Sequence, residues 1–302
     1  MIRPALASAV LLALACRGGA SEAQQFDGNL AHRFVEHMVA AGPRVPNTPA
    51  HRAIGDWLIS ELRQRADTVI VQEWVHVTGQ HDSLHLRNIF ARFKPAEASR
   101  VLYVSHWDSR PRSDMDPDPA KRNQPTPGAN DGGSSTAMLL ALADELKRQP
   151  PAMGVDLLFV DGEDYGAFDG DNAPDVLIGA QYFANHMPPG YQPLFAIVWD
   201  MVGDYTQEFS QEGYSVRNAP EVVERVWSTA RRLGLSRVFK DSDGGATTDD
   251  HLPLQRAGLR TIDVIDCCND HYPYWHTTQD TPDKVSPQSL ANVGKVALAL
   301  VR

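Results

Sequence analysis

The chain has 302 residues, with 28 Lys and Arg against 38 Asp and Glu, and a formal net charge of −10. Because nucleic-acid binding needs a basic surface, this acidic balance argues against a nucleic acid as partner. Hydrophobic residues make up 42% of the chain, and the 22 Gly and 21 Pro follow no period, which excludes a disordered or collagen-like chain. Three cysteines are too few for a disulfide scaffold.

The N-terminal segment has the pattern of an export signal. Arg3 precedes an apolar run over residues 5–15. This run is shorter than the about 20 residues that span a bilayer, but it suits the core of a secretory signal. We therefore predict a signal or lipoprotein signal over residues 1–23 and a periplasmic or cell-envelope location. Two ways of processing this signal stay open, cleavage after Ala23 and lipid attachment at Cys16. After the signal, no stretch of the sequence predicts a transmembrane helix.

The region after this signal begins with helices and continues with strands. Apolar residues recur at helical spacing over residues 28–66, with a break at the segment 42–49, which is rich in Gly and Pro. Residues 68–77 and 86–93 have the β-branched and aromatic composition of strands. The chain therefore begins with two helices followed by two strands.

From residue 101 onward, predicted strands alternate with predicted helices. The strands are residues 101–104, 155–160, 194–199 and 261–265, and the helices are residues 134–147, 178–186, 222–233 and 286–300. Continuous apolar strands between helices indicate a sheet that is covered on both faces. Because no linker or repeat interrupts the pattern, we predict one domain over residues 24–302. Its fold class is α/β, a three-layer α/β/α sandwich with a mostly parallel mixed central sheet.

Acidic residues and histidines gather where the predicted strands end. The groups are Ser105–Asp108, Gly128–Ser135, Asp161–Asp164, Asp200–Asp204, Asp249–His251 and Tyr274–Thr277. Each group alone has an ordinary explanation, such as Asp131 as a helix N-cap. Open α/β sheets, however, place their sites at the carboxyl ends of strands, so we expect the groups to meet. One histidine with two carboxylates is a frequent ligand set for catalytic zinc.

The adjacent residues Glu163 and Asp164 can take two different roles. Adjacent side chains of an extended or turn backbone point to different sides. One carboxylate can therefore bind a metal while the other moves protons at the substrate.

The order of these residues resembles the zinc-dependent aminopeptidase superfamily, over about residues 40–302. The matching positions are His106, Trp107, Asp108, Asp131, Glu163, Asp164, Asp200 and His276. The resemblance implies a zinc exopeptidase-like fold in which Asp131 bridges two zinc ions. His106 and Asp200 would complete one metal position, Asp164 and His276 would complete the other, and Glu163 would be the base.

Within that superfamily, four features are similar to the animal-type glutaminyl-peptide cyclotransferases. They are Gly42-Pro43-Arg44 followed by Pro46, Asp249-Asp250-His251 followed by Pro253, Trp275 before His276, and an insertion over residues 168–177. The resemblance implies one zinc on Asp131, Asp164 and His276. Glu163 would then be the proton shuttle, with Asp200 and Asp249 in its hydrogen-bond network and Trp275 lining the pocket.

Two positions depart from the cyclotransferase pattern. Position 164 is Asp, where that family usually has Glu, so the carboxylate is one methylene shorter. The disulfide of the animal enzymes near the first His has no counterpart, because no cysteine lies between Cys16 and Cys267. For Cys267 and Cys268 we expect small apolar residues at the end of a strand, with a vicinal disulfide as the alternative.

The favoured function is therefore that of an acyltransferase, a zinc-dependent glutaminyl-peptide cyclotransferase. It would convert the N-terminal Gln of peptides or proteins to pyroglutamate and release ammonia. The alternative is a two-zinc aminopeptidase, which the retained His106 and Asp200 favour. A binding domain that has kept the fold is the least favoured, because the acids are intact at all the positions.

Overall fold

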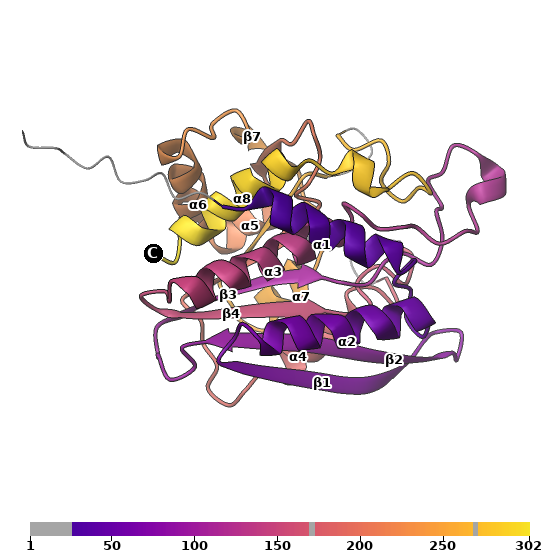
Figure 1. Cartoon of the computed structure of the whole chain (residues 1–302), viewed down its shortest axis with the longest axis horizontal. Coiled ribbons are helices and arrows are strands. Elements are labelled where there is room, and N and C mark those ends of the chain that lie inside the picture. The colour runs from indigo at the N-terminus through magenta and orange to yellow at the C-terminus, as the bar shows by residue number, and fades with distance from the viewer. Residues whose placement is uncertain (1–25, 169–172, 268–270) are drawn as a thin grey trace, which may run out of the picture.

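The computed structural model describes residues 26–168, 173–267 and 271–302, so the predicted signal over residues 1–23 lies outside the described part (Figure 1). A six-stranded sheet has the order β1-β2-β4-β3-β5-β8. Its strands are β1 (Thr68–Val77), β2 (Ser83–Phe93), β3 (Arg100–His106), β4 (Gly154–Val160), β5 (Phe195–Asp200) and β8 (Thr261–Ile265). Strand β2 is antiparallel to β1 and β4, whereas β4, β3, β5 and β8 are parallel. The predicted mostly parallel mixed sheet is confirmed.

Helices cover both faces of this sheet (Figure 1). One layer contains α1 (Gly28–Ala40), α2 (Pro49–Arg63), α3 (Gly133–Arg148), α6 (Pro220–Arg232) and α8 (Pro287–Ala299). The other layer contains α4 (Ile178–Asn185) and α7 (His251–Arg256). Val101 and Tyr103 of β3 pack into the first layer, and Leu102 and Val104 pack into the second. Since successive side chains of a strand point to opposite faces, a continuous apolar strand serves both cores.

Local sequence signals explain where several helices begin. The Asp27 carboxylate accepts a hydrogen bond from the backbone N–H of Leu30 at 2.9 Å and caps α1. The Thr48 hydroxyl caps α2, which then begins with Pro49, and Ser286 caps α8 in the same way. Capping side chains satisfy the free N–H groups of the first helical turn, and Pro suits the first helical position.

The elements that the sequence analysis missed are short. They are β6 (Phe209–Gln211), β7 (Phe239–Asp243), α5 (Gly213–Asn218), α7 and the 3-10 turns Pro119–Lys121 and Pro282–Lys284. Strands β6 and β7 form a separate parallel pair. Most of β7 is polar and exposed, so no alternation of apolar residues marks it in the sequence. These two strands form because the tertiary fold brings them together.

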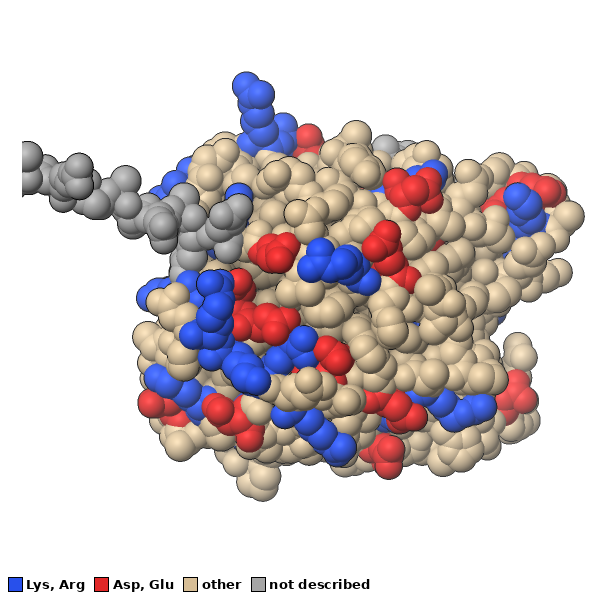
Figure 2. Space-filling model, viewed as in Figure 1, with Lys and Arg blue, Asp and Glu red and all other residues tan. Residues whose placement is uncertain are grey.

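Three further findings concern cysteine, membrane spans and charge. Cys267 is disulfide-bonded, so the favoured expectation of a small apolar residue at a strand end is wrong for this position, whereas Cys268 lies outside the described residues. Over the described ranges, no helix combines the length and apolar character needed to cross a bilayer. On the face in Figure 2, basic and acidic side chains lie beside one another over the described surface, and several basic side chains gather towards the left.

Candidate active site

The carboxyl ends of the parallel strands bring the predicted site residues together. His106 is the last residue of β3 and Asp200 is the last residue of β5, while Glu163 and Asp164 follow β4. Asp131 lies just before α3, where Gly132 adopts a φ of 36°. A Cβ at Gly132 would lie 2.6 Å from the His106 carbonyl oxygen, so only glycine allows this loop to approach β3 so closely.

The first ligand set contains His106, Asp131 and Asp200. The Nε2 atom of His106 lies 3.2 Å from Asp131 Oδ1 and 3.2 Å from Asp200 Oδ1. All three residues are buried, and their ligand atoms lie within 4.8 Å of one another.

The second ligand set shares Asp131 and adds Asp164 and His276. The Nε2 atom of His276 lies 3.4 Å from Asp131 Oδ2 and 3.4 Å from Asp164 Oδ1. His276 has a φ of 54°, in the left-handed region that a non-glycine residue adopts only where its surroundings hold it there. Strain of this kind concentrates at functional sites.

The residues of the second set fit a zinc ion. Asp131 Oδ2 and Asp164 Oδ2 are buried and have no hydrogen-bond partner. A buried carboxylate oxygen without a donor is costly, and a divalent cation would satisfy both oxygens at once. Two carboxylates and one imidazole leave a fourth position of a tetrahedral ion open, as catalytic zinc sites do.

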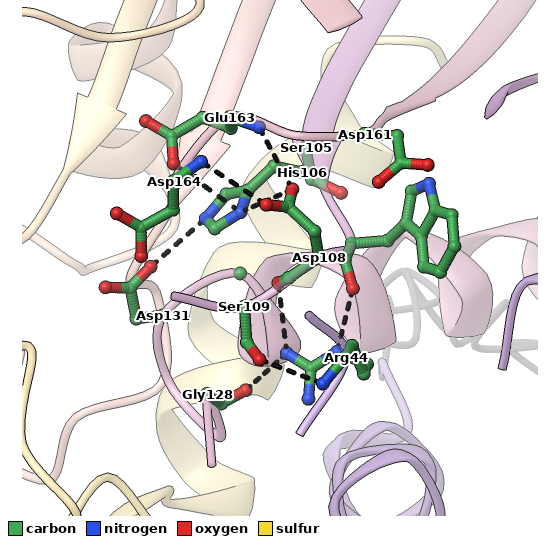
Figure 3. Close-up of polar contacts among 12 residues, drawn as sticks. Arg44, Ser105, His106, Asp108, Ser109, Gly128, Asp131, Asp161, Glu163 and Asp164 are labelled. Atoms are coloured by element: carbon green, nitrogen blue, oxygen red, sulfur yellow. Dashed lines mark hydrogen bonds and ion pairs between the residues drawn. The ribbon is translucent and has the colours of Figure 1, made fainter. Parts of the chain in front are cut away.

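Asp108 fixes the acidic pair Glu163 and Asp164. Its carboxylate accepts hydrogen bonds from the backbone N–H of Glu163 at 3.1 Å and of Asp164 at 3.3 Å (Figure 3). Asp108 Oδ1 also lies 3.5 Å from His106 Nδ1. One buried carboxylate therefore sets the positions of the His106 ring and of the turn that carries both acids.

Arg44 joins the two loops that carry Asp108 and Asp131. Its buried guanidinium donates to the carbonyl oxygens of Trp107 at 2.7 Å and of Gly128 at 2.6 Å (Figure 3). In the sequence, Arg44 is marked by the resemblance alone, without a role. The contacts assign it to holding the ligand loops together, because a planar guanidinium can donate to several carbonyls at once.

The acids of the site differ in their affinity for protons. Burial raises the pKa of Glu163 well above its ordinary value, and neighbouring carboxylates add to this effect, which suits a group that must accept and release a proton. Burial raises the pKa of Asp200 to about 7. Burial also opposes ionisation of Asp164, but His276 and Arg110 outweigh it and lower its pKa to about 2.

A cavity of about 290 Å³ opens onto these groups. Its lining includes the zinc-ligand candidates Asp131, Asp164 and His276, the acids Glu163, Asp200 and Asp249, and the apolar side chains of Phe168, Met201, Ile265 and Trp275. The half-buried Trp275 ring stacks on the His276 ring, with centroids 3.7 Å apart. Of the predicted insertion, residues 169–172 lie outside the described part.

Several buried residues beside the site escaped the sequence analysis. Asp280 accepts hydrogen bonds from the backbone N–H groups of Asn130 at 2.8 Å and Asp131 at 3.2 Å. Asp263 on β8 forms a buried group with Asp249 and His251, whose ligand atoms lie within 4.8 Å of one another. Each is a single acid in a segment without a motif, so the sequence offered no signal for either.

Comparisons with known proteins identify relatives of this chain. Residues 88–301 match peptidase family M28. The chain is 23% identical to the glutaminyl-peptide cyclotransferase of Bos taurus, over 94% of this chain and 82% of that protein.

Solved structures share the fold, and two of them are similar to this chain over most of its length. One is a Zn-dependent exopeptidase from Parabacteroides distasonis, with a TM-score of 0.87 and 39% identity over 92% of this chain and 99% of the other. The second is the glutaminyl cyclase of Tannerella forsythia, with a TM-score of 0.87 and 39% identity over 92% of this chain and 98% of the other. The chain belongs to peptidase family M28 and is an enzyme of that superfamily, a zinc-dependent glutaminyl cyclase or exopeptidase.

Proposed function

We propose that this enzyme is a glutaminyl-peptide cyclotransferase with one zinc ion on Asp131, Asp164 and His276. Its substrates are peptides and proteins with an N-terminal Gln. We further propose that residues 24–302 act as one catalytic domain and that residues 1–23 direct export to the periplasm or cell envelope. Fractionation of cells that express the full chain, with detection of the mature N-terminus, tests the export.

The residues that line the small cavity are the main support for this proposal. Glu163, Asp200 and Asp249 face the same space as the three zinc ligands, and Trp275 forms part of its wall. Cyclisation transfers a proton between two nitrogen atoms of one residue, so an acid–base group and the metal must face the same small substrate. A cavity with several acids and an aromatic wall meets that need.

The proposed reaction rearranges one residue. The α-amine nitrogen forms a bond to the side-chain amide carbon, and the bond from that carbon to the amide nitrogen breaks. Glu163 accepts a proton from the attacking amine and returns it to the departing nitrogen, which leaves as ammonia. Bound zinc would polarise the carbonyl group of the side-chain amide.

The other acids and Trp275 prepare this step. We assign Asp200 and Asp249 to the proton-transfer network of Glu163, because both line the same cavity and Asp249, in addition to burial, raises the pKa of Glu163. Trp275 would orient the Gln side chain against the wall of that cavity. Because attack is intramolecular, positioning contributes much of the acceleration.

The alternative is a two-zinc aminopeptidase, and the first ligand set favours it. His106, Asp131 and Asp200 are all buried with their ligand atoms within 4.8 Å of one another. Such an enzyme would use Glu163 to activate a water molecule for hydrolysis of the first peptide bond.

A paired assay separates the two reactions. The purified protein is given a Gln-initiated peptide and a Leu-anilide, and its zinc content is measured in the same sample. The cyclotransferase predicts ammonia release, a blocked N-terminus and the loss of one ammonia in the mass spectrum. Release of free N-terminal amino acids with two zinc ions per chain would overturn the proposal in favour of the aminopeptidase.

A further inference from the structure

Arg110 is a buried cation that contacts a proposed zinc ligand. Its Nη1 atom donates to Asp164 Oδ1 at 2.6 Å and to the carbonyl oxygen of Gly166 at 3.0 Å. The opposite edge of the guanidinium donates from Nε and Nη2 to the two carboxylate oxygens of Asp114, at 2.8 and 2.6 Å. The Arg110 side chain is 3% exposed. It therefore lies behind Asp164 and cannot contact a substrate directly.

Asp114 reaches the second of the three proposed ligands. Its Oδ1 atom lies 3.6 Å from His276 Nδ1, the ring nitrogen on the side away from Asp131 and Asp164. The backbone N–H of Met115 also donates to the His276 carbonyl oxygen at 3.1 Å. The segment that carries Arg110 and Asp114 is thus fastened to the loop of His276.

The charges of this pair matter as much as its contacts. A lone Arg beside Asp164 would repel a bound cation. Asp114 neutralises Arg110 on its opposite edge, so the pair adds no net charge and leaves the negative charge of Asp131 and Asp164 for the metal. The paired hydrogen bonds also fix the orientation of the guanidinium relative to the carboxylate, which a compact charge such as an ammonium group does not.

We propose that Arg110 and Asp114 are positioning residues that orient Asp164 and His276 for zinc. Partners of this kind set the orientation and basicity of metal ligands, and their loss typically lowers metal affinity about 10–100-fold. The inference rests on the proposed zinc site but not on the reaction that the site performs. It also explains how the shorter Asp can occupy position 164, because Arg110 holds its carboxylate in place.

The competing explanation is that Arg110 only stabilises the fold. Arg100 provides a matched control, because it forms a similar buried pair in the sheet. Its Nη2 atom donates to Asp156 Oδ1 at 2.8 Å, and its Nε atom donates to Asp156 Oδ2. Its side chain is 6% exposed, close to the value for Arg110. Arg100→Met therefore removes a buried pair of guanidinium and carboxylate without touching a proposed zinc ligand, while Asp156 keeps Arg92 and Tyr191 as partners.

The experiment measures zinc affinity by competition with a chromophoric chelator. The variants are Arg110→Met, Arg110→Lys, Asp114→Asn and the control Arg100→Met, each first checked for folding by circular dichroism. We expect zinc binding to weaken about 10–100-fold in Arg110→Met. The loss should be smaller in Arg110→Lys, which keeps the positive charge but not the planar set of N–H donors of the guanidinium. Arg100→Met should bind zinc as the wild type does. Asp114→Asn should weaken binding too, and it tests the proposal if Arg110→Met does not fold.

Cobalt substitution gives a second measure that is independent of activity. Visible absorption of Co²⁺ reports ligand geometry, so the spectrum should change in Arg110→Met and stay as in the wild type in Arg100→Met. Unchanged zinc affinity in both Arg110→Met and Asp114→Asn, or equal loss in Arg100→Met, would overturn the positioning role. A wild-type protein that binds no zinc would instead overturn the proposed metal site itself.

Discussion

The two ligand sets share Asp131, but their other carboxylates have opposite surroundings. Asp164 accepts a hydrogen bond from Arg110 and faces His276, and these contacts lower its pKa to about 2 despite burial. Asp200 is buried near Asp131 and Asp249, and burial raises its pKa to about 7 although His106 lies beside it. In the metal-free chain, Asp164 is therefore ionised at neutral pH, whereas Asp200 is protonated in part.

A set of suitable residues is therefore not yet a prepared metal site. A cation must displace protons from its ligands, so affinity falls where a ligand holds its proton near neutral pH. By this argument the set Asp131, Asp164 and His276 is the better prepared of the two.

Metal removal should have the largest effect. Chelation should abolish turnover, because no side chain of the cavity can replace the Lewis acid. Titration of zinc into the chelated protein should restore activity at one ion per chain. Full activity in a sample verified to be metal-free would contradict the zinc requirement, and restoration only at two ions would favour the aminopeptidase.

Glu163→Gln should remove the proton shuttle without removing the metal. The change keeps the size of the side chain but not its ability to accept a proton, and such groups typically contribute about 10²–10⁴-fold to the rate. Turnover and zinc content should be measured on the same preparation. Loss of zinc from Glu163→Gln would mean that Glu163 is a ligand.

Asp164→Asn and Asp200→Asn form a matched pair, one from each ligand set. Each replaces a buried carboxylate with an amide of the same shape. Asp164→Asn should lose zinc on dialysis, because a charged ligand is removed. Asp200→Asn should retain its zinc and lose activity only. The reverse result in the zinc analysis would invert the ranking of the two sets.

Trp275→Ala should lower kcat/KM strongly and stability modestly. The ring lines the cavity and is half-buried, so its loss should cost less than the about 3–5 kcal/mol of a fully packed Trp. Trp227 is buried on α6 and serves as the control. Trp227→Ala should destabilise the fold more, while its folded fraction keeps normal specific activity. A collapse of Trp275→Ala with normal specific activity would make Trp275 a core residue.

The pH dependence of stability should be the subtlest difference. The pKa of Asp200 is raised from 3.8 to about 7 in the folded state. Its contribution to the free energy of unfolding is therefore complete below pH 3.8 and is lost as the pH rises through 7. The pKa of Asp164 is lowered from 3.8 to about 2 in the folded state. Its contribution to the free energy of unfolding is present above pH 3.8 and is lost as the pH falls through 2. Chemical denaturation of metal-free wild type and Asp200→Asn checks the first statement. The wild type should lose stability relative to Asp200→Asn as pH rises from 4 to 7; parallel curves would contradict it.

The long helices and the strands of the main sheet could be predicted from the sequence, and so could the acids and histidines that gather at strand ends. Strands 68–77 and 261–265 were predicted with the bounds that the structure has. The first of these strands is marked by β-branched and aromatic residues and the second by a mostly apolar run, and amphipathic helices repeat every 3.6 residues. All of these are local patterns. The acids and histidines at strand ends could be identified because they follow the predicted strands directly in the sequence.

The surroundings of these groups, and the side chains without a motif that hold them, depend on the tertiary fold. Arg110 and Asp164 are 54 residues apart in sequence, and Asp280 is 149 residues from the backbone N–H of Asp131 to which it bonds. No local pattern encodes such pairs, since they depend on how loops from separate strands pack. The pKa of a carboxylate depends on burial and on neighbouring charges within a few ångströms. The contrast between Asp164 and Asp200 therefore arises in the folded chain alone.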